Sequence, residues 1–273
     1  MNLETIPEEK LKEILSLKEA QVRLVVREKA RSDFMAFAHH VYENFIEGKH
    51  HKIIAEKLER IAKGELKRLI VNMPPRHSKS ELASYLMPAW FLGRNPKLKI
   101  IQATHNTELA VRFGRKVRDL IDDPHYKDVF PKTDLKADSK AAGRWETSEG
   151  GEYFAAGVGA AVTGRGADLF IIDDPHSEQD ALSEMAFDNA YEWYTSGPRQ
   201  RLQPGGAIIV VMTRWGLKDL TGRLIKAQGS DIMSDEWEIV EFPAILPSDK
   251  PLWPQFWEKD DLLKVKASLP LAK

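Results

Sequence analysis

Residues 69–84, LIVNMPPRHSKSELAS, combine a short apolar run, a proline-rich turn and a Lys-Ser pair at the start of a helix-like segment. A strand, a loop and a helix N-terminus in this order present backbone N–H groups and a positive dipole end to phosphate. In the pattern G-x-x-x-x-G-K-[ST], Lys79 and Ser80 take the lysine and hydroxyl positions, while Met73 and Ser78 replace both glycines. We therefore expect Lys79 to reach the β- and γ-phosphates of a nucleotide and Ser80 to bind Mg²⁺.

The loop taken alone has a second interpretation, because a Lys-Ser pair at the start of a helix is often just solvated surface. Serine at position 78 is tolerable if its backbone stays out of the left-handed region. The residues expected to contact the phosphates are Pro75, Arg76, His77, Ser78, Lys79 and Ser80.

A pair of carboxylates ends a second apolar run further along the chain. Asp173 and Asp174 directly follow the apolar residues 169–172. A carboxylate at such a strand end can hold the Mg²⁺ of a bound nucleotide, which we assign to Asp173, and the next one, Asp174, can orient and activate the attacking water. An Asp-Asp-Pro turn is the alternative, since such turns are common after strands. The order of lysine loop and acidic strand end favours the nucleotide site.

Further polar residues could complete this site. Thr213 ends a third apolar run and could sense the γ-phosphate; alternatively it satisfies backbone groups while Arg214 pairs with an aspartate. Arg76, in the loop, and Arg165, in the segment TGRGAD, are candidates for stabilising transition-state charge. Glycines on both sides give Arg165 reach, so it could serve a neighbouring subunit's site, or it could be a solvated loop residue.

The elements that position these residues alternate between strand and helix. Strands are expected at 67–74, 98–106, 168–175, 206–215 and 237–245, and a β-ribbon at 151–157 before a mobile glycine-rich segment. Helices are expected at 7–38, 50–65, 78–96, 107–123 with Thr107 as cap, 178–194, 217–228, and within 253–273. This alternation predicts an α/β fold with a mostly parallel sheet flanked by helices on both faces, as in P-loop NTPases of the ASCE type. We expect residues 1–40 to form a helical appendage packed on a core of residues 41–250.

Composition limits the other classes of function. The 273 residues contain no cysteine, which excludes disulfides and thiolate metal sites. A net charge of −1 means that any nucleic-acid contact must come from a local patch. No apolar run approaches the roughly 20 residues that a membrane span needs.

Five motifs follow one another along the chain: VNMPPRHSKSELAS, GRNP, VTGRGADLFIIDDP, EWYTSGPRQRL and VVMTRWGLKDLTGRL. Together they resemble the ATPase domain of a known family, the large terminase subunit of tailed bacteriophages, which pumps double-stranded DNA into a procapsid. The resemblance covers residues 34–243. It implies Mg-dependent ATP hydrolysis with ATP and Mg²⁺ as cofactors. By position it matches Lys79 and Ser80 with the phosphate loop, Asp173 with the magnesium aspartate, Asp174 with the catalytic carboxylate, Thr213 with the coupling motif, and Arg76 and Arg165 with arginine fingers in cis and in trans.

Two departures from the family stand out. The catalytic carboxylate is often glutamate there, and Asp174 is one methylene shorter. The adenine-binding motif is not evident; residues 45–51 are our assignment. Family members continue into an RNase H-like nuclease domain, so we expect residues 251–273 to begin a linker toward a domain absent from this chain.

The resemblance also implies partners. These are double-stranded DNA held through its phosphates, the portal protein, the small terminase subunit and further copies of the chain in a pentameric ring on the procapsid, with a monomer in isolation and no membrane contact. The expected location is the cytoplasm of the infected bacterium and not the mature virion. Alternatives are a helicase-like translocase, disfavoured because no second motor domain is visible, a small-molecule kinase or nucleotide switch, disfavoured by the carboxylate after Asp173, and an inactive nucleotide-binding scaffold.

Overall fold

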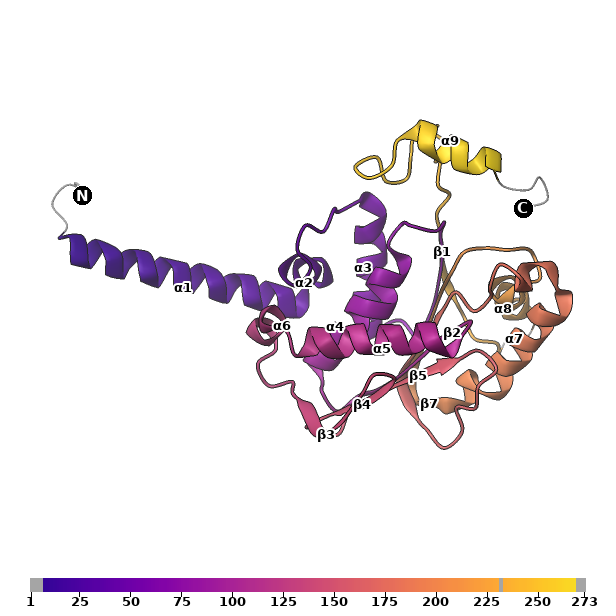
Figure 1. The fold of residues 1–273 in the computed structure, drawn as a ribbon, viewed down its shortest axis with the longest axis horizontal. Coiled ribbons are helices and arrows are strands. Elements are labelled where there is room, and N and C mark those ends of the chain that lie inside the picture. Colours follow the sequence, from indigo (N-terminus) through magenta and orange to yellow (C-terminus); the bar gives the residue numbers. More distant parts are fainter. Residues whose placement is uncertain (1–6, 231–232, 269–273) are drawn as a thin grey trace.

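The computed structural model describes residues 7–230 and 233–268, and its centre is one eight-stranded sheet (Figure 1). The strands are β1 (Arg68–Asn72), β2 (Lys99–Thr104), β3 (Leu135–Ala141), β4 (Arg144–Thr147), β5 (Glu152–Gly157), β6 (Ala167–Asp173), β7 (Leu202–Met212) and β8 (Glu238–Glu241). They lie in the order β3-β4-β5-β2-β6-β7-β1-β8. The six strands from β5 to β8 in this order are parallel, and β3 and β4 pair antiparallel at one edge. The predicted α/β class and mostly parallel sheet are confirmed.

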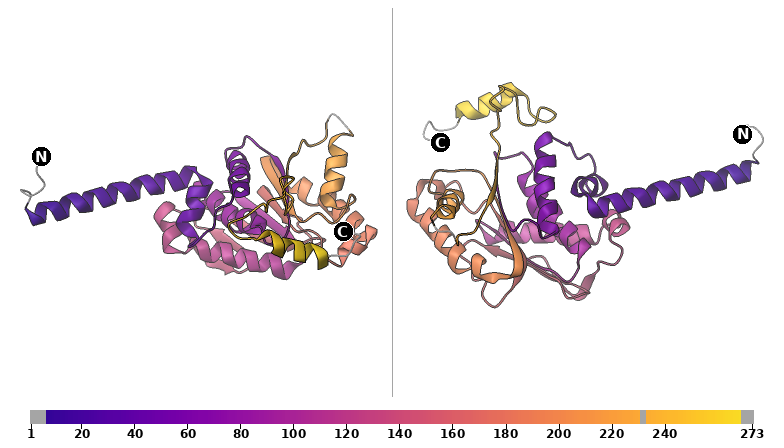
Figure 2. Two further views of the ribbon diagram at one scale, coloured as in Figure 1. Left: turned by 90° about the horizontal axis from the view of Figure 1, so that it is seen from above. Right: turned by 180° about the vertical axis from the view of Figure 1, so that it is seen from behind.

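Helices cover both faces of the sheet, as the two further views show (Figure 2). The α-helices of the described residues are α1 (Glu8–Ser32), α2 (Phe34–Val41), α3 (Lys49–Ala62), α4 (Met87–Arg94), α5 (Thr107–Ile121), α6 (Pro124–Val129), α7 (Glu184–Ser196), α8 (Leu220–Gln228) and α9 (Lys259–Ser268), with a π-helical turn η2 (Glu81–Leu86) before α4. Leu69 and Val71 of β1 face the core that includes α3, α4 and α5. Ile70, between them, faces the core that includes α7 and α8. All residues of β1 are buried, as expected for a parallel strand covered on both faces.

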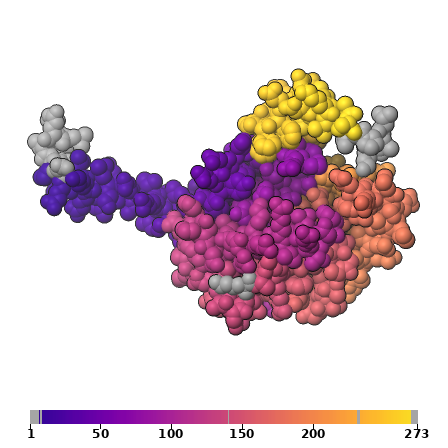
Figure 3. Space-filling view, in the orientation of Figure 1, coloured from indigo at the N-terminus to yellow at the C-terminus, as the bar shows by residue number. Residues whose placement is uncertain are grey.

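The N-terminal helix does not pack on the core along its length, contrary to the expectation. In Figures 1 and 3, α1 projects from the body of the protein, and Leu15, Val22 and Val25 are 52%, 62% and 63% exposed. Only its last turns are anchored; there the Trp90 indole donates a 3.0 Å hydrogen bond to the Ala30 carbonyl. An amphipathic pattern predicts a helix but does not specify what covers its apolar face.

Other differences are local. The β-ribbon is larger than predicted, because β3 and β4 extend the sheet beyond β5. The cap of α5 is Asn106, whose side chain accepts from the Leu109 N–H at 2.8 Å, and not Thr107. None of the helices within the described ranges is long and apolar enough to cross a membrane.

Candidate active site

The carboxyl ends of β1, β6 and β7 bring the predicted polar residues together. β7 lies between the other two strands and pairs in register with both, Met212 opposite Asn72 and Val211 opposite Asp173. The phosphate loop follows β1, Asp173 ends β6 with Asp174 directly after it, and Thr213 follows β7. Because parallel strands end at the same edge of a sheet, three segments distant in sequence form one site there.

Lys79 lies at the centre of this site. Its ammonium nitrogen is 2.9 Å from Asp174 Oδ2 and donates to Thr213 Oγ1 at 3.2 Å. Asp174 Oδ1 in turn accepts from the Thr213 backbone N–H at 2.8 Å. The Lys79 side chain is 7% exposed, so its charge depends on these partners for compensation. The three residues therefore form one connected network.

Asp173 lies beside this network and is held by hydroxyl groups. Ser80 Oγ donates to its Oδ1 at 3.0 Å, and Ser84 Oγ donates to its Oδ2 at 2.7 Å. Burial, and after it the neighbouring Asp174, raise the pKa of the Asp173 carboxyl to about 7, against the lowering effect of Lys79 and the two serines. A cation at this carboxylate would therefore stabilise its charged form.

The residues around Asp173 fit a magnesium ion. Carboxylate and hydroxyl oxygens are hard donors, and Mg²⁺ is usually bound by one or two carboxylates together with substrate phosphates, not by a cage of side chains. Over residues 7–230 and 233–268, no group of three or more His, Cys, Asp or Glu residues could hold a metal ion by itself. Ser80 and Asp173 therefore suit an ion that arrives with a nucleotide.

Three non-glycine residues around the site have left-handed backbone conformations. Arg76, Ser78 and Asp174 have φ angles of 61°, 68° and 42°. The condition for a strain-free serine at position 78 is therefore not met, because Ser78 adopts the conformation that glycine would supply. Each such residue costs roughly 1–2 kcal/mol, and strained residues cluster at functional sites.

A cavity of about 400 Å³ opens beside the phosphate loop. Its lining includes Arg76, Ser78, Lys79 and Ser80 and a set of aromatic and apolar side chains, Tyr42, Phe45, Ile46, Trp253 and Phe256. The Trp253 and Phe256 rings stack with centroids 4.4 Å apart. Phe45 and Ile46 belong to the segment assigned to adenine. The aromatic residues after β8 were missed, because no local pattern shows that this segment folds back onto the loop.

The rest of the assigned segment 45–51 lies behind the loop. His50 and His51 are buried, with ring centroids 3.9 Å apart. His50 Nε2 donates to the His77 carbonyl at 3.3 Å, and His77 Nδ1 donates to the Pro75 carbonyl at 2.8 Å. Burial lowers the pKa of His50 to about 4 and that of His51 to about 3, the latter also through His50. These neutral rings support the loop from the core side.

A second cavity, of about 570 Å³, also has Lys79 in its lining. Asp174, Thr213 and His176 line it, together with Pro75. Asp174 thus faces open space in this cavity and does not line the aromatic cavity. This is a suitable place for an attacking water.

The two candidate arginine fingers lie in different places. Arg76 lines the aromatic cavity, and its carbonyl accepts from the Trp257 indole at 3.4 Å. Arg165 lies at the amino ends of the parallel strands, opposite the candidate site. There it forms an ion pair with Glu152, and its guanidinium carbon is 4.0 Å from the centre of the Phe154 ring. The structure therefore does not bring Arg165 to the site of its own chain.

The two readings of Thr213 and Arg214 are resolved in part. Arg214 pairs with an aspartate, Asp219, at 2.9 Å, as the ordinary alternative predicted. The Thr213 hydroxyl contacts Lys79 and also reaches the Met73 carbonyl at 3.5 Å. Thr213 thus satisfies local groups and touches the phosphate-loop lysine at the same time.

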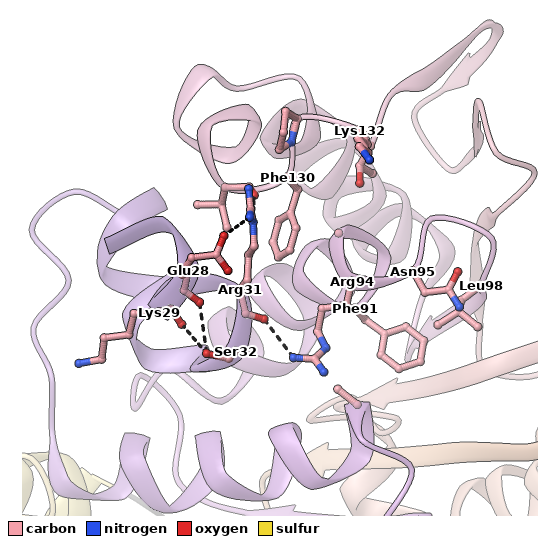
Figure 4. A pocket seen from close by; sticks show the side chains of 15 residues that line it. Glu28, Lys29, Arg31, Ser32, Phe91, Arg94, Asn95, Leu98, Phe130 and Lys132 are labelled. Atoms are coloured by element: carbon pink, nitrogen blue, oxygen red, sulfur yellow. Dashed lines mark hydrogen bonds and ion pairs between the residues drawn. The ribbon is translucent and has the colours of Figure 1, made fainter. Parts of the chain in front are cut away.

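A larger cavity than these two, of about 920 Å³, lies elsewhere (Figure 4). The C-terminal ends of α1, α3, α4 and α6 converge on it, and Arg31, Arg94 and Lys132 contribute to its lining. The Arg94 guanidinium donates to the Arg31 carbonyl at 3.0 Å. Cations at helix C-termini offset the negative ends of the helix dipoles, so these residues have a structural explanation.

Comparison with family models of proteins gives no match, and comparison with curated protein sequences gives none either. Several solved structures match the fold, including the following two. The HK97 bacteriophage large terminase is 13% identical at a TM-score of 0.50, over 84% of this chain and 45% of that one. The Thermus phage P74-26 large terminase ATPase domain is 15% identical at a TM-score of 0.50, over 79% of this chain and 88% of that one.

This chain has the fold of a large terminase ATPase domain. The predicted P-loop NTPase-like architecture is thereby confirmed. The chain spans less than half of the HK97 large terminase, 45%, and most of the P74-26 ATPase domain, 88%. At these identities the likeness shows the fold, and the chemistry of this terminase-like domain must be argued from its own residues.

Proposed function

We propose that the chain is the ATP-hydrolysing motor domain of a terminase large subunit, which drives double-stranded DNA into a procapsid. The observation that carries this proposal is the convergence of Lys79, Asp173, Asp174 and Thr213 at one sheet edge. A lysine loop opposite two strand-end carboxylates is an arrangement suited to phosphoryl transfer. Among the possible uses of such a site, the similarity in fold to terminase ATPase domains supports the proposal of DNA packaging.

ATP would occupy the two cavities that have Lys79 in their lining. The base would stack in the aromatic cavity on Tyr42, Phe45, Trp253 or Phe256, which line it. The phosphates would lie along the loop from Pro75 to Ser80, where backbone N–H groups and the start of the following helix favour anions. Ser80 and Asp173 would hold Mg²⁺, which neutralises charge on the phosphates.

Hydrolysis requires Lys79 to exchange partners. In the structure its ammonium is paired with Asp174 Oδ2 at 2.9 Å. Moving Lys79 toward the β- and γ-phosphates would free Oδ2 to accept a proton from the attacking water, while Oδ1 stays bonded to the Thr213 N–H. Thr213 contacts both groups, so it would pass the change to the segment after β7.

The proposed assembly is a ring of copies, a pentamer, on the procapsid in the cytoplasm of the infected bacterium. Arg76 would act in its own site. Arg165, which is 22% exposed and paired with Glu152 at the amino ends of the strands, would act in the next subunit's site after leaving Glu152. DNA would be held through its phosphates, because a packaging motor must ignore sequence. The portal protein and the small terminase subunit complete the proposed set of partners.

The test is ATP turnover by the purified protein, with and without double-stranded DNA. Lys79→Ala should abolish turnover, with a loss of at least about 100-fold, because the transition-state charge loses its main cation. Lys132→Ala removes an exposed lysine from the 920 Å³ cavity and is the matched control. Unchanged turnover by Lys79→Ala, with normal circular dichroism, would rule out this site.

A further inference from the structure

Ser84 is a polar residue at the site that the phosphate-loop pattern does not include. It is fully buried, and its hydroxyl donates to Asp173 Oδ2 at 2.7 Å. It lies in η2, the turn directly after the phosphate loop. The hydroxyl therefore reaches the carboxylate from beneath the loop.

Both carboxylate oxygens of Asp173 accept hydrogen bonds from one segment, residues 80–84. Ser80 donates to Oδ1 at 3.0 Å, and Ser84, one turn later, donates to Oδ2 at 2.7 Å. Ser84 lies within the π-helical turn η2, after which the Met87 N–H bonds to the Leu82 carbonyl, five residues back. Such π-helical turns often occur at functional sites. Two donors on different oxygens fix the rotation of the carboxylate plane.

The two serines differ in what they can do for a cation. Ser80 is only partly buried and lines the aromatic cavity beside the phosphate loop, so its oxygen is available to an ion. Ser84 is absent from the linings of both cavities around Lys79 and contacts the carboxylate from the core. Its hydroxyl can orient Asp173 but cannot itself reach the phosphates.

We propose that Ser84 is a positioning residue that orients the carboxylate of Asp173 for the divalent cation accompanying the nucleotide. The inference rests on the proposed function, since it assumes that Asp173 holds this cation. Outer partners of metal-binding carboxylates fix their orientation and so contribute to metal affinity. Without Ser84, Oδ2 would have no donor in a site only 2% exposed, and the carboxylate could rotate away from the cation.

The experiment measures binding of a fluorescent ADP derivative to the 273-residue protein, in EDTA and across a Mg²⁺ titration. Ser84→Ala should weaken the Mg²⁺-dependent part of binding by about 10–100-fold, while binding in EDTA changes by less than about twofold. Ser84→Thr keeps the donor and should recover most of the loss. Ser84→Cys, a weak donor of similar size, replaces Ser84→Ala if that variant does not fold.

The control is Thr147→Val, which removes another fully buried hydroxyl, bonded to the Pro96 carbonyl and remote from the site. It should leave Mg²⁺ dependence unchanged. A wild-type protein that binds ADP without any effect of Mg²⁺ overturns the metal assignment and this inference together. If the wild type responds to Mg²⁺ and Ser84→Ala responds equally, or loses binding equally in EDTA, only the role of Ser84 is overturned.

Discussion

Lys79 and Asp174 form an ion pair, 2.9 Å from ammonium nitrogen to Oδ2, that joins the phosphate loop to the end of β6. In this arrangement the proposed phosphate-binding cation and the proposed catalytic base neutralise each other. In the proposed mechanism, a nucleotide must replace Asp174 as the partner of Lys79 before the Asp174 carboxylate is free to act as a base. We therefore propose that hydrolysis is coupled to phosphate binding by this single exchange of partners.

Asp174→Asn should abolish hydrolysis while retaining nucleotide binding. The amide keeps the size of the side chain but cannot accept the water's proton, so kcat should fall by about 100–10,000-fold. Nucleotide binding should be unchanged or tighter, because Lys79 loses a competing anion. Measuring kcat together with ADP affinity checks both points. Asp138→Asn, an exposed aspartate on β3, is the control, and a kcat within about threefold of wild type for Asp174→Asn would contradict the assignment.

Tyr42→Ala should weaken nucleotide binding more than it slows the chemistry. Tyr42 lines the aromatic cavity beside the phosphate loop, and loss of one aromatic contact to a base costs roughly 1–3 kcal/mol. KM for ATP should therefore rise by about tenfold with kcat nearly unchanged. Tyr191→Ala, at another half-buried tyrosine outside this cavity, is the matched control. A fall in kcat at constant KM would show that the adenine base of ATP does not bind in this cavity.

Arg165→Ala should lower turnover only in assembled rings. Its guanidinium is bound to Glu152 at the edge of the sheet far from Lys79, so its removal leaves the site of its own chain intact. Mixing Arg165→Ala with Asp174→Ala subunits should restore part of the activity, because each supplies what the other lacks. Arg144→Ala is a close control, since Arg144 lies 3.4 Å from the same Glu152. Mixed rings without recovered ATPase activity would exclude action in trans.

The buried histidine pair predicts loss of stability in acid. His50 and His51 have pKa values lowered to about 4 and about 3, so the unfolded chain binds more protons than the folded one below pH 6.5. Their contribution is fully present above pH 6.5 and falls as the pH drops toward 4, by up to about 2 kcal/mol per histidine between pH 6.5 and 5.

Urea unfolding at pH 7.5 and pH 5 measures this effect. The loss on acidification should be smaller in His51→Gln than in the wild type. Comparing the two proteins removes the opposite contribution of Asp173, whose raised pKa favours the folded state as the pH falls from 7 toward 4. His125→Gln, at an exposed histidine, should change nothing. Equal slopes for His51→Gln and the wild type would show that His51 is not buried as a neutral ring.

The sequence by itself determined the order of strands and helices and most of the polar residues at the sheet edge. β-branched runs such as residues 69–71 predict buried parallel strands because both faces must be apolar. Strand-end residues in parallel sheets meet at one edge whatever the detailed packing. For that reason Lys79, Asp173 and Thr213 could be placed together before the structure was known.

Tertiary structure alone decided what packs across long gaps in the chain. Trp253 and Phe256 reach the aromatic cavity because the segment after β8 folds back onto the phosphate loop. Arg165 lies far from the site of its own chain because the loop after β5 returns to the amino ends of the parallel strands. Ser84 meets Asp173 only through the register of η2 against β6. Local patterns encode periodicity and burial, whereas these contacts depend on how whole elements are stacked, which no short stretch of sequence specifies.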